Sequence, residues 1–340
     1  MKLKSLKLKT LLNSFLHAGL AACLVASTPL FAAENYANRD DVQMFIKEMV
    51  TKNSFDVDEL NRVFSKAKFQ PSVIKAILPP SSPTVRSWSR YRPRFVNAQR
   101  IAKGQAFMKK YAETLKRAAD TYQVPPEIIA SIIGVETVYG ANTGNYRVLD
   151  ALTTLSFDYP KRADYFKTEL EAFLLLCREE GIDVTSMKGS YAGAVGLPQF
   201  MPSNIRKLAV DFDGDGVIDL RNNPIDAIGS VARYFQAFGW QKDAPIAIAI
   251  DAAEPIPAVY LQDITPVLTY SDVADLKFLP QTTENQRILD EGIKFAFIPL
   301  ETPDTPTEYW LGFNNFYVIT RYNKSSFYAM SVLQLAEAIK

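Results

Sequence analysis

Residues 125–140 read PPEIIASIIGVETVYG, and they predict a buried helix. Pro126 suits the first helical position, and Glu127 suits the positive N-terminal end of the helix. Isoleucines follow on nearly all sides, which is typical of a helix enclosed by other elements rather than of a surface helix. Glu136 lies in the last predicted turn, and no other charged residue separates it from Glu127. The stretch therefore places a lone carboxyl at the end of an apolar helix.

Two effects are expected to raise the pKa of Glu136, namely desolvation by apolar neighbours and the negative end of the helix dipole. A carboxyl that stays protonated near neutral pH serves as a general acid. Gly140, Asn142 and Gly144 then open the chain into a loop that a substrate can approach. From the residues alone, a solvated glutamate at a frayed helix end remains the alternative.

Helical spacing of apolar residues extends around this helix, from about residue 39 to residue 180. Residues 107–122 are expected to form one longer helix, and residues 164–180 another that stops at Gly181. After Trp240 the pattern changes to short β-branched or aromatic runs, which predict strands at 246–250, 258–261, 267–270 and 294–299. A helix near 326–339 closes the chain. We expect an α+β fold, mainly helical, with a helical catalytic domain at 34–240, a small β-containing subdomain at 241–312, and a C-terminal segment at 313–340 that returns to the catalytic cleft.

The charge of the chain is unevenly distributed. Of its 340 residues 48% are hydrophobic, and the formal net charge is +1. Lys2, Lys4, Lys7 and Lys9 crowd the N-terminus, so the remainder holds 34 basic and 37 acidic residues, a net charge of −3. A near-neutral body argues against non-specific binding of nucleic acid, which requires a basic surface.

The N-terminus, residues 1–33, is interpreted as an export signal. Its basic start precedes the apolar residues 11–27, which are too short and too polar for a good transmembrane span. Two processing routes stay open. Leu20-Ala21-Ala22-Cys23 is similar to a lipoprotein box that ends at a lipidated Cys23, and Phe31-Ala32-Ala33 is similar to an ordinary cleavage site. A buried N-terminal helix is the third alternative, and it gives the lysines no role. We expect a periplasmic protein, anchored to the outer membrane as a lipoprotein if Cys23 is lipidated.

Removal of the signal has a chemical consequence, because His17 is the only histidine of the chain. A mature protein without histidine cannot use Ser-His-Asp or Cys-His catalysis or a His-ligated metal. Cys177 is then the remaining cysteine apart from Cys23, and its apolar helical neighbours indicate a core thiol rather than a nucleophile.

Three ordered motifs carry a resemblance to a known family. Residues 133–140 (IGVETVYG) resemble the catalytic-glutamate motif of the membrane-bound lytic murein transglycosylase B family, glycoside hydrolase family 103. Residues 188–203 (KGSYAGAVGLPQFMPS) resemble its second motif, and Thr320-Arg321-Tyr322-Asn323 with Tyr328 resembles its C-terminal motif. With residues 149–152 and the segment up to Tyr165, the resemblance covers nearly all of the mature chain.

The resemblance implies a lysozyme-like catalytic domain and a lytic transglycosylase that cleaves the MurNAc-β-1,4-GlcNAc bond of peptidoglycan without water. Glu136 is then the single general acid and base, and the product carries a 1,6-anhydroMurNAc end. The residues implied to bind substrate are Ser190, Gln199, Tyr165, Tyr234, Tyr322, Asn323 and Tyr328. Ring faces of sugars pack on aromatic side chains, and phenol and amide groups bond their hydroxyls.

Residues 211–219, DFDGDGVID, predict a calcium loop. Oxygen ligands stand at positions 1, 3, 5, 7 and 9 of an EF-hand, namely Asp211, Asp213, Asp215, the carbonyl of Val217, and Asp219. Position 12 is Asn222 instead of the usual glutamate, and the family resemblance implies that Asp226 completes the site. The alternative is an Asp-Gly turn that binds calcium only weakly. No organic cofactor is expected.

Two rival functions remain. A hydrolytic muramidase needs a water and a second carboxylate, for which Asp150 and Asp158 are the candidates. A non-catalytic, calcium-stabilised scaffold that binds peptidoglycan is the rival from another class. Glycan strands are the expected partner in every case. Membrane association through Cys23 and contacts with wall-synthesis enzymes are further expectations.

Overall fold

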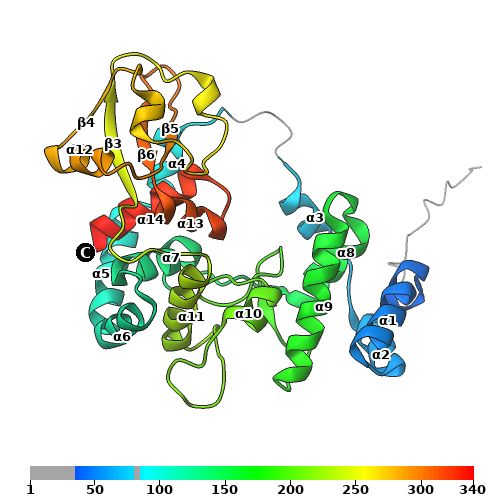
Figure 1. Ribbon diagram of the computed structural model, residues 1–340. Helices are drawn as coiled ribbons and strands as arrows, with labels where there is room; N and C mark the ends of the chain where they lie inside the picture. The colour runs from blue at the N-terminus through cyan, green and yellow to red at the C-terminus, as the bar shows by residue number, and fades with distance from the viewer. Residues whose placement is uncertain (1–34, 80–84) are drawn as a thin grey trace, which may run out of the picture. The chain divides into compact units, whose positions relative to one another are not determined.

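The computed structural model describes residues 35–79 and 85–340, so the signal segment, Cys23 and most of the proline-rich break after Leu78 lie outside the described residues. Helices dominate (Figure 1). They are α1 (Asp40–Asn53), α2 (Val57–Lys66), α3 (Pro71–Ile77), α4 (Trp88–Tyr91), α5 (Ala98–Lys110), α6 (Ala112–Tyr122), α7 (Pro126–Thr137), α8 (Val148–Asp158), α9 (Ala163–Glu179), α10 (Pro202–Leu208), α11 (Pro224–Ala237), α12 (Thr283–Asp290), α13 (Asn314–Tyr322) and α14 (Ser326–Ile339).

The central helix α7 begins at Pro126 and ends at Thr137, as its sequence predicts. Every residue from 128 to 135 is buried, because α5, α6, α11 and α14 all pack against this helix. The last helix, α14, carries apolar residues on most of its surface and lies against α7 and α5. These two strongly hydrophobic helices thus pack against each other, although almost two hundred residues separate them in the chain.

One of the predicted helices is wrong. Residues 107–122 form the end of α5 and the whole of α6, with a break at Tyr111, whose backbone leaves the helical region at φ −110° and ψ 24°. The aromatic ring of Tyr111 packs on Phe107, with ring centroids 4.7 Å apart. The apolar periodicity continues across the break, which is why it does not mark the boundary.

The strands form a four-stranded antiparallel sheet in the order β4-β3-β6-β5, built from β3 (Ala247–Ala252), β4 (Phe278–Pro280), β5 (Ala296–Leu300) and β6 (Glu308–Gly312). An apolar cluster of its own supports the sheet and includes Ile248, Phe278, Phe297 and Leu311. A second, two-stranded pair joins β1 (Tyr146–Arg147) to β2 (Lys188–Gly189).

The strand predictions after Trp240 are partly wrong. The predictions at 246–250 and 294–299 correspond to β3 and β5. Residues 258–261 instead contain the 3₁₀ turn Ala258–Tyr260, in which Tyr260 N and Leu261 N donate to Pro257 O and Ala258 O within the turn and not to another strand. In residues 267–270 only Leu268 forms a bridge, to Phe295, before another 3₁₀ turn. The strands β4 and β6 were missed, since their short runs have little period of their own.

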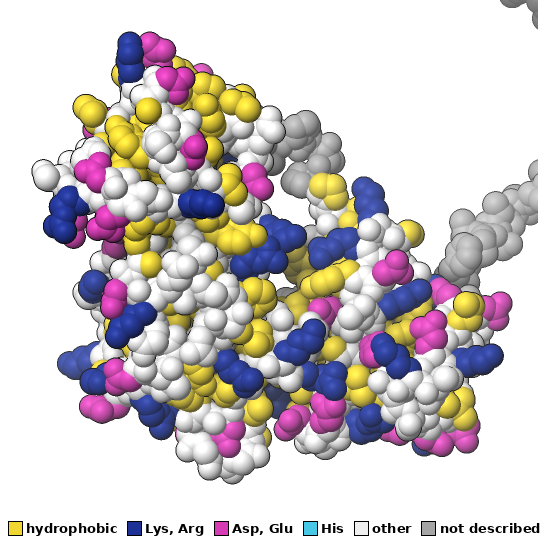
Figure 2. All heavy atoms as spheres, in the orientation of Figure 1, with side chains coloured by type: hydrophobic (Ala, Val, Ile, Leu, Met, Phe, Trp, Pro, Cys, Tyr) yellow, Lys and Arg dark blue, Asp and Glu magenta, His cyan; other side chains and the backbone are white. Residues whose placement is uncertain are grey.

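Charged side chains of both signs are intermingled over the face shown in Figure 2, as expected for a near-neutral protein. Among residues 35–79 and 85–340, no helix is both long enough and apolar enough to cross a membrane.

Candidate active site

Glu136 occupies the last turn of α7, where the buried helix meets a loop. Its side chain is partly buried, and burial raises the pKa of Glu136 from its ordinary 4.5 to about 7. A hydrogen bond from Tyr328 acts in the opposite direction and lowers this pKa, because it favours the charged carboxylate. The carboxyl is therefore able both to donate and to accept a proton near neutral pH.

The Tyr328 hydroxyl donates to Glu136 Oε1 at 2.5 Å. Tyr328 lies in the first turn of α14, and its backbone N–H is capped by the Ser325 hydroxyl. The pKa of Tyr328 is well above its ordinary value because of burial first and the nearby Glu136 charge second. Its phenol therefore stays protonated and available as a donor to the carboxylate.

Tyr234 and Tyr322 pack against each other, with ring centroids 4.7 Å apart. The Tyr322 hydroxyl donates to the Pro198 carbonyl at 2.5 Å, and the Tyr234 hydroxyl donates to the Arg321 carbonyl at 2.7 Å. Burial first, and then the charge of Glu136 among other groups, raise the pKa of both phenols. Tyr328 therefore contacts Glu136 directly, while Tyr234 and Tyr322 pack on each other and are held by backbone carbonyls.

The second motif forms a glycine-rich loop beside the segment that follows α7. Gln199, at φ 50°, donates through Nε2 to Thr143 O at 3.1 Å and to Gly196 O at 2.9 Å. The Ser190 hydroxyl accepts from Ala192 N and Ala194 N, so it organises its own turn. Gly144 packs against this turn so closely that a Cβ there would lie 2.1 Å from Gly189 O. The loop thus brings Gln199 and Ser190 to the chain that leaves Glu136.

The remaining predicted sugar contacts are more exposed. Tyr165 is 41% exposed, and the Arg162 guanidinium lies 4.5 Å from the centroid of its ring. Asn323 is exposed at the C-terminal end of α13, directly after Tyr322.

Sequence reasoning missed Tyr91. Its ring packs on Phe327 at 5.5 Å, next to Tyr328 in α14. Burial raises the pKa of Tyr91, Arg94 lowers it, and the charge of Glu136 raises it further. Because Phe327 precedes the Tyr328 that bonds Glu136, Tyr91 packs on the element that holds the carboxyl. The available signal was the run WSRYRPR at 88–94, in which aromatic and basic residues alternate directly after a proline-rich break.

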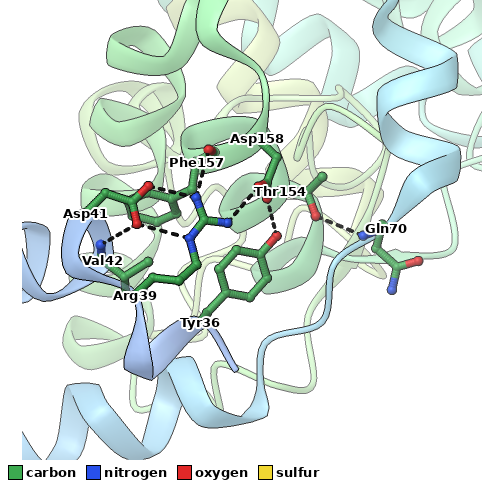
Figure 3. A network of polar contacts seen from close by, with 8 residues as sticks. All are labelled: Tyr36, Arg39, Asp41, Val42, Gln70, Thr154, Phe157 and Asp158. Atoms are coloured by element: carbon green, nitrogen blue, oxygen red, sulfur yellow. Dashed lines mark hydrogen bonds and ion pairs between the residues drawn. The ribbon is translucent and has the colours of Figure 1, made fainter. Parts of the chain in front are cut away.

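Asp150 and Asp158, the candidate second acids, are both engaged elsewhere. Asp150 is buried and accepts from Lys68 N, Gln70 Nε2 and Arg147. Figure 3 shows Asp158 between Tyr36 and Arg39, whose side chains donate to it at 2.5 and 2.6 Å. Both carboxylates therefore hold N-terminal segments onto α8, which is a structural task.

The acidic loop gathers fewer carboxylates than its sequence predicts. Oxygens of Asp211, Asp213 and Asp226 lie within 4.8 Å of one another. Asp226 is fully buried, and burial first, then the charges of Asp213 and Asp211, raise its pKa. A cation would neutralise this repulsion, so the donor set fits a hard metal ion.

The other predicted ligands lie outside this group. Asp215 Oδ1 accepts from Val217 N, and Asp219 accepts from Arg221 N and Asn222 N. Val217 is 55% exposed.

The Cys177 thiol is buried, and burial raises its pKa to about 12, which agrees with a core position.

Known proteins resemble this chain both in sequence and in structure. Residues 37–337 match the family model described as transglycosylase SLT domain. The chain is 42% identical over 315 residues to the membrane-bound lytic murein transglycosylase B of Escherichia coli, which covers 90% of this chain and 84% of that protein. The structure of the soluble lytic transglycosylase SltB1 from Pseudomonas aeruginosa is 44% identical, with a TM-score of 0.81 over 88% of this chain and 98% of that one. The Escherichia coli lytic transglycosylase Slt35, solved in complex with calcium, is 42% identical, with a TM-score of 0.79 over 90% and 94% of the two chains.

Proposed function

Because this chain belongs to the transglycosylase SLT domain family and is a lytic transglycosylase of peptidoglycan, we propose that Glu136 is the single general acid and base of its reaction. The observation that carries this proposal is the environment of the carboxyl. It lies at the end of a buried helix, its pKa is raised to about 7 by burial, and one phenol donates to it. Such a group is protonated in a large fraction of molecules at neutral pH.

The proposed reaction needs no water. Protonated Glu136 donates its proton to the glycosidic oxygen between N-acetylmuramic acid and N-acetylglucosamine, and the C1–O bond breaks. The resulting carboxylate, held by the Tyr328 hydroxyl, takes the proton of the muramic C6 hydroxyl, and O6 closes the bond to C1. Glu136 ends protonated as it began, and the products are a new GlcNAc end and a 1,6-anhydro ring.

A hydrolytic outcome has little support. An inverting or retaining hydrolase positions a second carboxylate across the bond. Asp158 is bonded to Arg39 and Tyr36, and Asp150 to Arg147 and backbone, so neither is free to activate water or attack a sugar.

Digestion of purified sacculi tests the proposal. Wild type is expected to release muropeptides lighter by one water than the hydrolysed products, and Glu136→Gln is expected to release none. Glu127→Gln is the matched control, because Glu127 lies at the opposite end of the same helix and pairs with Lys340 at 2.9 Å. Anhydro products at the wild-type rate from Glu136→Gln would remove the basis of the proposal.

For substrate binding, we propose that Tyr91 and Tyr322 present ring faces, the Tyr322 hydroxyl being bonded to the Pro198 carbonyl. Tyr234 is only 3% exposed and packs on Tyr322, so we propose that it supports that ring and does not touch sugar. Exposed Tyr165 and Asn323 are the candidates for hydrogen bonds to sugar hydroxyls. Gln199 offers its amide oxygen, because its Nε2 is already bonded, and Ser190 lies on the neighbouring turn. Each role predicts a higher KM when that side chain is truncated.

We also propose that the β-containing segment 241–312 forms a subdomain beside the catalytic domain 34–240, with 313–340 returning to the cleft. Most of its buried apolar residues form a cluster of their own, which supports this division, while Ala296, Ile298 and Leu300 of β5 pack into the main core. The subdomain helps to place Tyr91, because Trp88 N donates to Glu301 O at 2.7 Å and Ser89 N donates to Thr302 Oγ1 at 3.1 Å.

For the acidic loop, we propose a structural calcium ion held by Asp211, Asp213 and Asp226, with Asp215, Asp219 and the Val217 carbonyl as further ligands. Calcium is expected to raise the Tm of wild type and leave that of Asp226→Asn unchanged. Asp183→Asn, an exposed aspartate in another turn, is the control and should respond like wild type. A calcium-independent Tm of the wild type, after treatment with chelator, would contradict this site.

We propose a periplasmic location after export, with Cys23 or a site after Ala33 as the processing point. Labelling with radioactive palmitate, in wild type and Cys23→Ser, separates the two. Label in wild type alone supports the lipoprotein, and no label in either supports cleavage near Ala33.

A further inference from the structure

The chain that follows Glu136 has an unusual backbone. Val138, Tyr139 and Gly140 have φ values of 54°, 59° and 88°, so three successive residues adopt left-handed or related conformations. Such conformations are unfavourable for a residue other than glycine, and a β-branched valine is an especially rare occupant. Strain of this kind persists only where neighbouring contacts enforce it, and it is common beside catalytic groups.

The first contact that enforces the turn is the hydroxyl of Thr137. This residue is fully buried, and its hydroxyl accepts from Gly140 N at 3.0 Å. It donates to Leu197 O at 2.9 Å, the shorter of two contacts, since Ile133 O of its own helix lies at 3.2 Å. Its carbonyl accepts from Asn142 N at 2.9 Å. One side chain therefore joins the end of α7 to both the turn and the second-motif loop.

The position of Leu197 gives this bond its importance. The next residue, Pro198, accepts from the Tyr322 hydroxyl, and Gln199 donates to Thr143 O. The Thr137 hydroxyl thus bonds the end of α7, next to Glu136, to the second-motif loop. That loop contains Gln199 and accepts the hydrogen bond from Tyr322 of α13. Glu136 itself is tied on the other side to Tyr328.

The second contact is the ring of Tyr139, which lies across two helical glycines. A Cβ on Gly104 of α5 would lie 2.3 Å from the Tyr139 hydroxyl oxygen, and one on Gly134 of α7 would lie 2.5 Å from Cζ. Phe107 packs on the same ring at 5.3 Å between centroids. The ring therefore holds the left-handed turn against α5 and α7. A side chain larger than that of glycine at position 104 or 134 would occupy the space of the ring.

We propose that Thr137 is a positioning residue for Glu136, and that the Tyr139 ring supports the turn in which Thr137 acts. This inference rests on the proposed role of Glu136. Without the bond to Leu197, the end of α7 can shift relative to the loop, and the Glu136 carboxyl moves away from Tyr328 and the bound glycosidic oxygen. A displacement of about 1 Å is enough to reduce turnover up to about 100-fold.

The test compares Thr137→Val with Thr137→Ser and Thr153→Val, with the concentration of folded enzyme measured for each. Thr153 is the matched control because it is also fully buried and its hydroxyl has no hydrogen-bond partner within the described residues. We expect Thr137→Val to lower kcat about 10-fold or more with little change in KM. The alkaline limb of its pH profile should move to higher pH, because a weaker Tyr328 bond no longer lowers the pKa of Glu136. Thr137→Ser should restore both, and Thr153→Val should resemble wild type.

A folded Thr137→Val with the kcat and pH profile of wild type would overturn the positioning role. So would an equal loss in Thr137→Ser, since the hydroxyl would then be irrelevant. If Thr137→Val does not fold, Thr137→Ala gives the same comparison without the added methyl group. An active Glu136→Gln would instead overturn the proposed function, so the two failures are distinguishable.

Discussion

The raised pKa of Glu136 makes a quantitative prediction about stability. The carboxyl has a pKa of about 7 in the folded protein and an ordinary value of 4.5 when exposed. Between these values the folded state binds more protons than the unfolded state, so the free energy of unfolding falls as the pH rises. The full difference corresponds to about 3 kcal/mol, and because the side chain is only partly buried we expect about 2–3 kcal/mol.

Glu136→Gln removes this titration while keeping an acceptor for the Tyr328 hydroxyl. Relative to wild type, the variant should gain about 2–3 kcal/mol of stability between pH 4.5 and pH 8, with most of the gain between pH 5 and pH 7. Urea unfolding of both proteins at several pH values measures the difference, and the other titrating groups cancel because both proteins contain them. Glu113→Gln, an exposed glutamate of α6, controls for the substitution itself. A Glu136→Gln difference that does not change with pH would refute the buried-acid argument.

Three further predictions concern single contacts. Tyr328→Phe removes the hydrogen bond that lowers the pKa of Glu136, so the alkaline limb of the rate profile should move up by about one pH unit; an unshifted limb would contradict it. Arg39→Met breaks the bonds to Asp41, Asp158 and Phe157 O and should cost about 1–3 kcal/mol of unfolding free energy, whereas Lys116→Met, from an exposed pair, should leave it nearly unchanged. Equal losses in urea unfolding would argue against a structural role for the Arg39 network. Gly144→Ala should lower the free energy of unfolding by about 3 kcal/mol or more, because φ is 92° and the new Cβ would clash with Gly189 O. Gly181→Ala, at φ 62° with no described atom within 4 Å of the new Cβ, should lower it by about 1 kcal/mol. Similar Tm values for the two variants would contradict this.

Local sequence was sufficient for α7 and for the chemistry at its end. The helix begins at a proline, continues with apolar residues and ends at one carboxylate, and this pattern predicts its burial. The prediction needs only residues within a few turns of one another. The same reasoning found the acidic loop and both strands that have a clear apolar run. It failed at Tyr111, where the apolar period continues through a helix break, and at residues 258–261, where β-forming residues lack a strand to pair with.

Tertiary structure alone decided which groups meet. Tyr328 bonds Glu136 although 192 positions separate them in the chain. Tyr91 packs on Phe327 of α14 from a segment that is bonded to Glu301 and Thr302, directly after β5. Asp158 could serve as an acid by its residue type, yet its carboxylate accepts hydrogen bonds from Arg39 and Tyr36. The amino-acid pattern therefore determined that an acid is buried at a helix end. Its partners follow from long-range packing, which periodicity does not record.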